Sequence, residues 1–227
     1  MTLPASPSGI AAVVFDMDGT LLDTEPLYRE AIYAACAELG YEMNDQLHTS
    51  QVGAPNDVAR ALFYAEFGDT FPFEVFHKRM HEIMAELEKR QQVARKPGAH
   101  DLLVYLKAQG IPAAVVTSTS RPAAPERLAR AGLTDLLDVV ITRSDVERGK
   151  PHPEPFLAAA TRLGVAPGAC LALEDSPNGV RSASAAGMIT VMVPDLVTPD
   201  EGTIALCDAV LGSLDAVRAA YFPERAA

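Results

Sequence analysis

Two aspartates near the start of this 227-residue chain have the type and spacing to do chemistry together. Asp16 and Asp18 follow the apolar run Ile10–Phe15 and are separated by a single residue. Side chains two positions apart on an extended chain point the same way, so both carboxylates can face one spot. Such a pair can hold a cation or supply a nucleophile and an acid/base group. Taken alone, the same residues also fit an ordinary Asp-Gly turn.

A second acidic pair closes a later apolar run. Glu174 and Asp175 follow Ala169–Leu173. Adjacent acids at the end of a buried strand are costly unless they bind something positive. Carboxylate oxygens are hard ligands that suit Mg²⁺. We therefore expect Asp16, Glu174 and Asp175 to hold this ion.

Hydroxyls and one lysine follow two further apolar runs. Ser118 and Thr119 come directly after Ile111–Thr117, where hydroxyls and free backbone N–H groups leading into a helix can cradle a phosphate. They are equally suited to be N-caps. Lys150 lies in a Pro-rich loop after Leu137–Thr142, and the prolines hold that loop stiff and would aim the amine. The alternative is an ordinary surface lysine.

The elements that position these residues can be read from the apolar runs. Each run is apolar on consecutive positions, which is typical of a strand buried on both faces of a parallel sheet. A fifth run covers Met188–Val193, and helical patterns separate the runs. This alternation predicts a doubly wound, Rossmann-like α/β sheet. Ligands bind beyond the carboxyl ends of such strands, and all four groups fall there.

The segment 24–96 breaks the alternation. It has helical patterns and no clear strand, so we expect an all-α cap inserted into a core of residues 1–23 and 97–227. The helices are expected at Pro26–Leu39, Asp57–Phe67 and Phe73–Val93.

Charge and composition exclude several classes of protein. The net charge of −11 argues against general affinity for nucleic acid or an anionic membrane. The three cysteines fit no disulfide framework or zinc spacing, and the N-terminus does not look like a signal peptide. No run reaches the ~18 apolar residues that span a bilayer. We expect a cytoplasmic protein.

Together the groups favour hydrolysis of a phosphate ester. Mg²⁺ would neutralise the charge that repels a nucleophile, while Lys150 and the Ser118 region hold the transferring oxygens. Asp16 would attack phosphorus and form an aspartyl-phosphate. Asp18 would protonate the departing alcohol and then deprotonate the attacking water.

Four motifs in this order resemble the haloacid dehalogenase superfamily over nearly the full length of the chain. They are Asp16–Thr20, Ser118, Gly149-Lys150-Pro151, and Glu174–Gly179. The resemblance implies a Rossmann-like core with a helical cap after the first motif. It also implies that Asp16 is the nucleophile, that Asp18 is the acid/base, and that the backbone carbonyl of Asp18 binds Mg²⁺. A monomer is the state that it favours.

Within that superfamily, two alternatives stay open beside a phosphatase. A β-phosphoglucomutase-type phosphomutase has a similar first motif and cap layout. Where those mutases carry His and Arg, however, this chain has Tyr28 and, after Gly53, Asn56. A binding protein that retains the fold would need neither a nucleophile nor an acid/base.

The cap would choose the substrate. The C-terminal half resembles phosphatases of small molecules such as sugar phosphates or pseudouridine 5′-phosphate. We expect a small phosphorylated metabolite as the partner. The candidate residues for contacting it are Tyr28, Gln51, Asn56 and Arg60.

Overall fold

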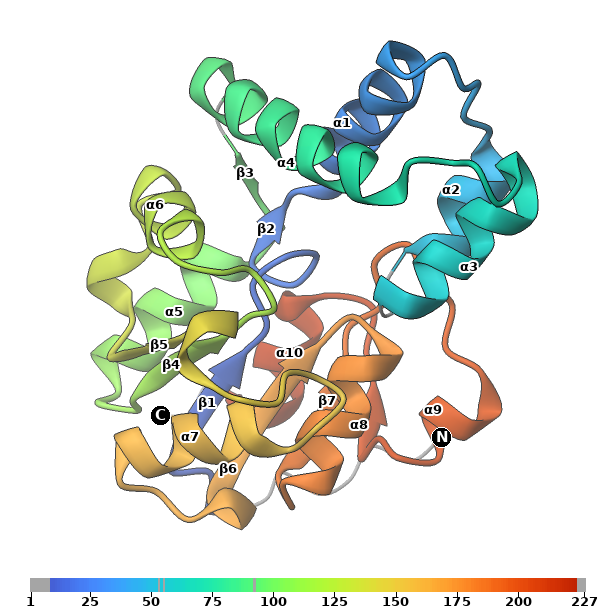
Figure 1. The fold of residues 1–227 in the computed structure, drawn as a ribbon. Helices are drawn as coiled ribbons and strands as arrows, with labels where there is room; N and C mark the ends of the chain where they lie inside the picture. The colour runs from blue at the N-terminus through green and yellow to red at the C-terminus, as the bar shows by residue number, and fades with distance from the viewer. Residues whose placement is uncertain (1–8, 53, 55, 92, 224–227) are drawn as a thin grey trace. The chain divides into compact units, whose positions relative to one another are not determined.

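A computed structural model describes residues 9–52, 54, 56–91 and 93–223 of the chain (Figure 1). The chain divides into two compact units. Unit 1 comprises Met1–Leu22 and Ala94–Ala227, and unit 2 comprises Asp23–Val93.

Unit 1 contains a parallel sheet of six strands in the order β5-β4-β1-β6-β7-β8. The first strand in sequence lies in the middle of the sheet, where Val13 of β1 pairs with Ala113 of β4 and with Leu171 of β6. The strands β1, β4 and β6 are buried on consecutive residues, as the apolar runs predict. The bounds are β1 Ala12–Phe15, β4 Ala113–Val116, β5 Val139–Ile141, β6 Cys170–Glu174, β7 Ile189–Met192 and β8 Ala209–Val210.

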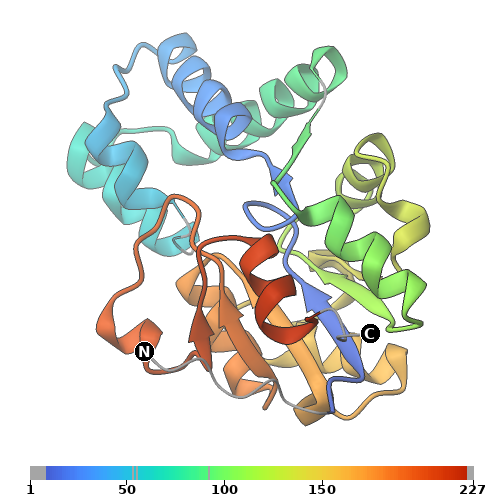
Figure 2. The same cartoon turned by 180° about the vertical axis from the view of Figure 1, so that it is seen from behind.

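Helices cover both faces of this sheet. Figure 1 shows α7 (Glu154–Leu163) and α8 (Pro177–Ala185) over one face, and Figure 2 shows α5 (Ala99–Ala108) and α10 (Leu214–Tyr221) over the other. Short apolar side chains of β1 and β4 pack with Phe156 of α7 in the core. The Rossmann-like fold class is therefore confirmed. The remaining helical elements of unit 1 are α6 Ala123–Arg130, α9 Glu201–Ile204, and the 3-10 turns η1 Thr134–Leu136, η2 Arg143–Asp145 and η3 Pro167–Ala169.

Unit 2 is built from helices around an aromatic core. The rings of Phe63 and Phe76 lie 4.6 Å apart between centroids, and Phe71 and Phe73 complete the cluster. Arg79 of α4 donates to Glu38 at the end of α1, which ties these two helices together. The bounds are α1 Glu25–Glu38, α2 Asp45–Gln51, α3 Asn56–Phe67 and α4 Phe73–Arg90.

Two short strands lie at the points in the sequence where the chain passes from one unit to the other. β2 (Leu22–Asp23) and β3 (Ala94–Arg95) form a two-stranded sheet. The sequence predicts no strand in the segment 24–96, so β3 corrects that expectation. A two-residue strand with exposed side chains leaves no hydropathy pattern to find.

Among the described residues, no helix combines the length and the apolar character needed to cross a membrane.

Candidate active site

Asp16 lies where β1 ends at the carboxyl edge of the sheet. Its backbone N–H donates to the Leu173 carbonyl of the neighbouring strand at 2.8 Å, which continues the ladder to this residue. The chain then turns at Gly19, whose φ of +92° favours glycine. A Cβ built on Gly19 would overlap Oδ2 of Asp175, so the turn and the acidic loop after β6 are in close contact.

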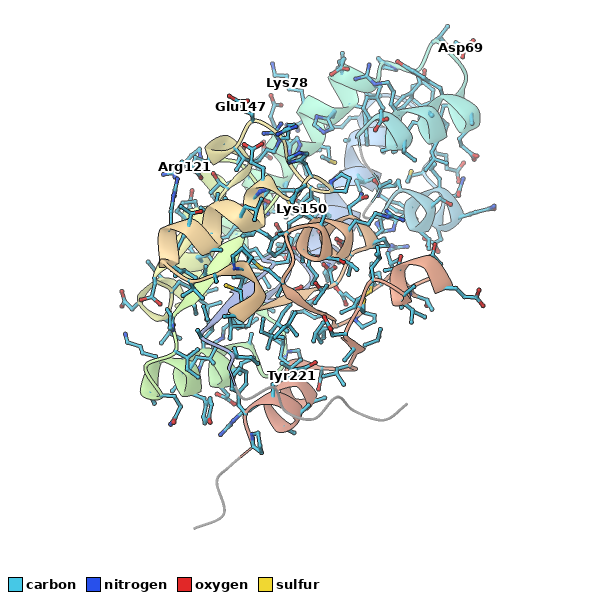
Figure 3. All side chains as sticks on the ribbon, turned by 90° about the horizontal axis from the view of Figure 1, so that it is seen from below. Asp69, Lys78, Arg121, Glu147, Lys150 and Tyr221 are labelled. Atoms are coloured by element: carbon cyan, nitrogen blue, oxygen red, sulfur yellow. The ribbon has the colours of Figure 1, made fainter. Side chains whose placement is uncertain are left out.

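Lys150 is buried and joins two of the predicted site residues. Its Nζ donates to Oδ1 of Asp16 and to Oε1 of Glu174, both at 2.5 Å, and to the Val116 carbonyl at 2.9 Å. Only 6% of its side chain is exposed. Figure 3 shows Lys150 within the body of unit 1, whereas Arg121 extends outward. The alternative of an ordinary surface lysine does not apply.

Glu174 is fully buried at the end of β6, and both of its carboxylate oxygens are engaged. Oε1 accepts from Lys150, and Oε2 accepts from the backbone N–H groups of Asp175 and Ser176 at 3.2 Å and from the Ser176 hydroxyl at 3.0 Å. The Ser176 hydroxyl in turn accepts from the N–H of Gly179 and caps α8. The carboxylate is thus held in one orientation.

The charges of this cluster shift its titration. Burial raises the pKa of Asp16 to about 8; the attraction of Lys150 opposes this shift, and the nearby carboxylates of Glu174 and Asp18 add to it. Burial would lower the pKa of Lys150, but the carboxylates of Asp16 and Glu174 outweigh it and raise that pKa. A further positive charge beside Asp16 would favour its carboxylate form.

Three acids converge where such a charge could bind. Asp16, Glu174 and Asp175 each offer a carboxylate oxygen, and these oxygens lie within 4.8 Å of one another. Because all the donors are hard oxygens and two of the residues are buried, the set fits Mg²⁺ better than a softer metal.

Two hydroxyl residues at the end of β4, Thr117 and Thr119, contact Asp18. The hydroxyls of Thr119 and Thr117 donate to Oδ2 of Asp18 at 2.7 and 3.3 Å. The N–H of Thr119 donates to the Thr117 hydroxyl at 2.9 Å. Ser118 is exposed between them. Thr119 therefore has a bond to Asp18 that the sequence did not predict.

Arg127 of α6 is a site residue that the sequence analysis missed. Its Nη1 donates to Oδ1 of Asp18 at 2.8 Å, and only 5% of its side chain is exposed. One signal was available in the sequence. Arg127 falls at the spacing of the buried stripe formed by Ala124 and Leu128, where an apolar residue is expected.

The candidate substrate-contacting residues all lie in unit 2. The side chain of Asn56, the first residue of α3, and the whole of Gly53 are outside the described residues. Tyr28 in α1 and Gln51 at the end of α2 are half-buried. Arg60 of α3 is paired with Glu74, and its guanidinium lies 5.0 Å from the centre of the Phe73 ring. Their contact with a substrate stays a prediction.

Comparison with known proteins places this arrangement among enzymes. Residues 10–187 match the family model described as haloacid dehalogenase-like hydrolase. The chain is 36% identical over 181 residues to a phosphorylated carbohydrates phosphatase of Thermotoga maritima, covering 78% of this chain and 82% of that protein. It is 34% identical over 211 residues to validoxylamine A 7′-phosphate phosphatase of Streptomyces hygroscopicus subsp. limoneus, covering 90% and 94%.

A solved structure is similar over most of both chains. The structure of CbbY from Rhodobacter sphaeroides in complex with phosphate superimposes with a TM-score of 0.76 at 31% identity, covering 90% of this chain and 95% of that one.

Proposed function

The chain belongs to the haloacid dehalogenase-like hydrolase family, and from this premise we propose that it is a Mg²⁺-dependent phosphatase that hydrolyses a small phosphomonoester through an aspartyl-phosphate on Asp16. One observation carries the proposal. The buried Asp16 carboxylate accepts from the ammonium of Lys150, and it offers an oxygen within 4.8 Å of oxygens of Glu174 and Asp175, a set suited to a hard cation. These groups, at the carboxyl ends of β1 and β6 and in the loop after β5, would supply the nucleophile, the phosphate-binding cation and the metal ligands of such an enzyme.

In the first step, a carboxylate oxygen of Asp16 attacks phosphorus and the P–O bond to the alcohol breaks. Asp18 gives its proton to the departing oxygen. Lys150 and Ser118 hold the non-bridging oxygens, and Thr119 contributes from the same loop. Asp16 and Asp175, with Glu174 and the backbone carbonyl of Asp18, would hold Mg²⁺, which neutralises charge on the phosphoryl group.

In the second step, Asp18 takes a proton from a water molecule as that water attacks the phosphorus of the aspartyl-phosphate. The bond to Asp16 breaks, and inorganic phosphate leaves with the carboxylate restored. Glu174 is held by Ser176 and in turn holds Lys150 next to Asp16. Glu174 would therefore keep Lys150 in position in both steps.

For the substrate we propose a phosphorylated sugar or a nucleotide-like phosphate. The names of the two phosphatase relatives specify phosphorylated carbohydrates and validoxylamine A 7′-phosphate, and the first of these supports the sugar phosphate. Unit 2 would act as the cap that selects it, through Tyr28, Gln51, Asn56 and Arg60. We further propose a cytoplasmic monomer; the charge of −11 disfavours binding to nucleic acid or anionic membranes.

The test is phosphate release from a panel of sugar and nucleoside monophosphates with Mg²⁺. Asp16→Asn should lower turnover at least about 10³-fold, because an amide is a poor nucleophile. Asp101→Asn, an exposed residue at the start of α5, is the matched control and should retain activity. Absence of phosphate release over the whole panel, or an active Asp16→Asn variant, would contradict the proposal. Interconversion of sugar phosphates with little net release would instead identify a phosphomutase.

A further inference from the structure

Arg127 is a buried cation that the two proposed chemical steps do not use. It lies on α6, with Ala124 and Leu128 of the same helix also buried. A buried guanidinium is costly unless a partner compensates it. Its Nη1 donates to Oδ1 of Asp18 at 2.8 Å and to the Thr119 hydroxyl at 3.2 Å.

The two buried cations of the site have separate carboxylate partners. Lys150 contacts Asp16 and Glu174, whereas Arg127 contacts Asp18. Asp18 thus has its own counter-charge, on the side of β4 and α6, although it lies only two residues from Asp16 in the chain. The proposed acid/base, Asp18, and the proposed nucleophile, Asp16, are thus each paired with a different cation.

The hydrogen bonds also distinguish the two oxygens of Asp18. Oδ1 accepts from Arg127, and a guanidinium has donors only, so a proton on Oδ1 would oppose that bond. Oδ2 accepts from the hydroxyls of Thr119 and Thr117, which can rotate and accept instead. Oδ2 is therefore the oxygen that can carry the transferable proton.

We propose that Arg127 is a positioning residue that holds Asp18 through Oδ1, so that Oδ2 delivers the proton to the leaving oxygen and takes it back from water. The inference rests on the proposed role of Asp18 as acid/base. Arg127 acts through Asp18 and the bridging hydroxyl of Thr119. Without Arg127, the donors to the Asp18 carboxylate among the described residues would be the hydroxyls of Thr117 and Thr119.

The test compares substrates that differ in their need for a proton. An alkyl phosphate releases a poor leaving group that needs the acid, whereas p-nitrophenyl phosphate releases a stable phenolate that does not. The measured quantity is kcat/KM, which covers the steps up to release of the alcohol or phenol. General acid catalysis contributes about 10²–10⁴-fold. We expect Arg127→Met to lower kcat/KM for a hexose phosphate by about 10²-fold and for p-nitrophenyl phosphate by less than about 3-fold.

A double variant asks whether Arg127 acts through Asp18. The Asp18→Asn variant already lacks the acid. Adding Arg127→Met to it should therefore cause no further change in kcat/KM for the hexose phosphate or for p-nitrophenyl phosphate. Arg127→Lys should recover part of the hexose phosphate activity, because it restores the charge without the planar fork. Arg130→Met, three residues further along α6, is the matched control and should behave as wild type.

A uniform loss on both substrates, or a further selective loss in the Asp18→Asn background, would overturn the inference. If Arg127→Met does not fold, Arg127→Gln keeps a hydrogen-bonding side chain without the charge and should produce the same selective loss in kcat/KM, and the absence of that loss would count against the inference. Either result with an active wild type leaves the phosphatase proposal standing. A wild type that hydrolyses neither substrate, nor any ester of the panel, would contradict the phosphatase itself.

Discussion

A side chain on Gly179 would occupy the space that the Glu174 carboxylate fills. A Cβ at this position overlaps the carboxyl carbon and both oxygens of Glu174. That carboxylate is fully buried and bonded to Lys150, Ser176 and the N–H of Asp175, so it cannot move without breaking those bonds. The absence of one methyl group therefore permits the whole arrangement of charges around Asp16.

We predict that Gly179→Ala displaces Glu174 and, with it, Lys150. Forcing extra volume into a packed site costs about 1–3 kcal/mol of stability, and loss of the Lys150 contact should lower phosphatase activity by more than about 10-fold. Urea unfolding and steady-state kinetics measure the two effects.

Gly212→Ala is the control for this prediction, because a Cβ at Gly212 meets no atom within 4 Å. It should be neutral, or stabilising by up to about 1 kcal/mol through the unfolded chain. Equal free energies of unfolding for the two variants would contradict the prediction, because they would show that the Glu174 side chain can move at no cost in stability.

At the scale of elements, η2 (Arg143–Asp145) after β5 depends on one half-buried aspartate, Asp145. Oδ2 of Asp145 accepts from the backbone N–H of Thr142 at 2.8 Å and from its hydroxyl at 2.5 Å. The first of these bonds is one half of a capping box, in which the Thr142 side chain also accepts from the backbone N–H of Asp145. Oδ1 accepts from Arg121 at 2.5 Å. Burial acts to raise the pKa of Asp145, but these hydrogen bonds outweigh burial and lower that pKa.

The lowered pKa fixes the sign of a pH dependence. The stabilisation is present above the unfolded-state pKa of about 3.9 and is lost as the pH falls through the folded-state value. We predict that Asp145→Asn lowers the free energy of unfolding by about 0.5–2 kcal/mol at pH 7. The difference from wild type should shrink below about pH 4.

Thermal unfolding of both proteins between pH 3 and pH 7 measures this dependence. Asp135→Asn, an exposed aspartate of η1, serves as the control. A difference that stays constant over this range would mean that the charge of Asp145 contributes nothing.

Elements of different length were predictable to different degrees. Ile10–Phe15 and Ala169–Leu173 predict β1 and β6 because consecutive burial demands consecutive apolar residues. The two-residue strands β2, β3 and β8 lie below the length at which hydropathy has a period. The sequence analysis did not predict the short helix α2. Its N-cap is Asn44, whose side-chain oxygen accepts a hydrogen bond from the backbone N–H of Leu47.

The candidate site divides in the same way. The sequence could predict a shared site for Asp16, Lys150, Glu174 and Asp175. The carboxyl ends of parallel strands lie at the same edge of the sheet, independently of the conformation of the loops. The ion pair of Arg127 with Asp18 joins residues 109 positions apart. It depends on how α6 packs, which a lone arginine within an apolar stripe suggests but does not specify.

At the scale of the whole molecule, the proposed chemistry belongs to unit 1 alone. Asp16, Lys150, Glu174 and Asp175 all lie within Met1–Leu22 and Ala94–Ala227. A ligand stabilises the unit that binds it, by RT ln(1 + [L]/Kd) when it binds the folded state only. Mg²⁺ should therefore stabilise unit 1 and leave the stability of unit 2, which has its own aromatic core, unchanged.

We predict that Mg²⁺ at 100 times its Kd adds about 2.7 kcal/mol of stability and raises the unfolding temperature of unit 1 by about 5–10 °C relative to protein in EDTA. Hydrogen exchange should slow in peptides that cover the ends of β1 and β6 and stay unchanged in α4, the longest helix of unit 2. Asp175→Asn removes one of the three converging carboxylates, so it should abolish both effects. Slower exchange in α4 as well would mean that the ion stabilises the two units as one cooperative structure, whereas a Mg²⁺ shift that survives Asp175→Asn would place the ion elsewhere.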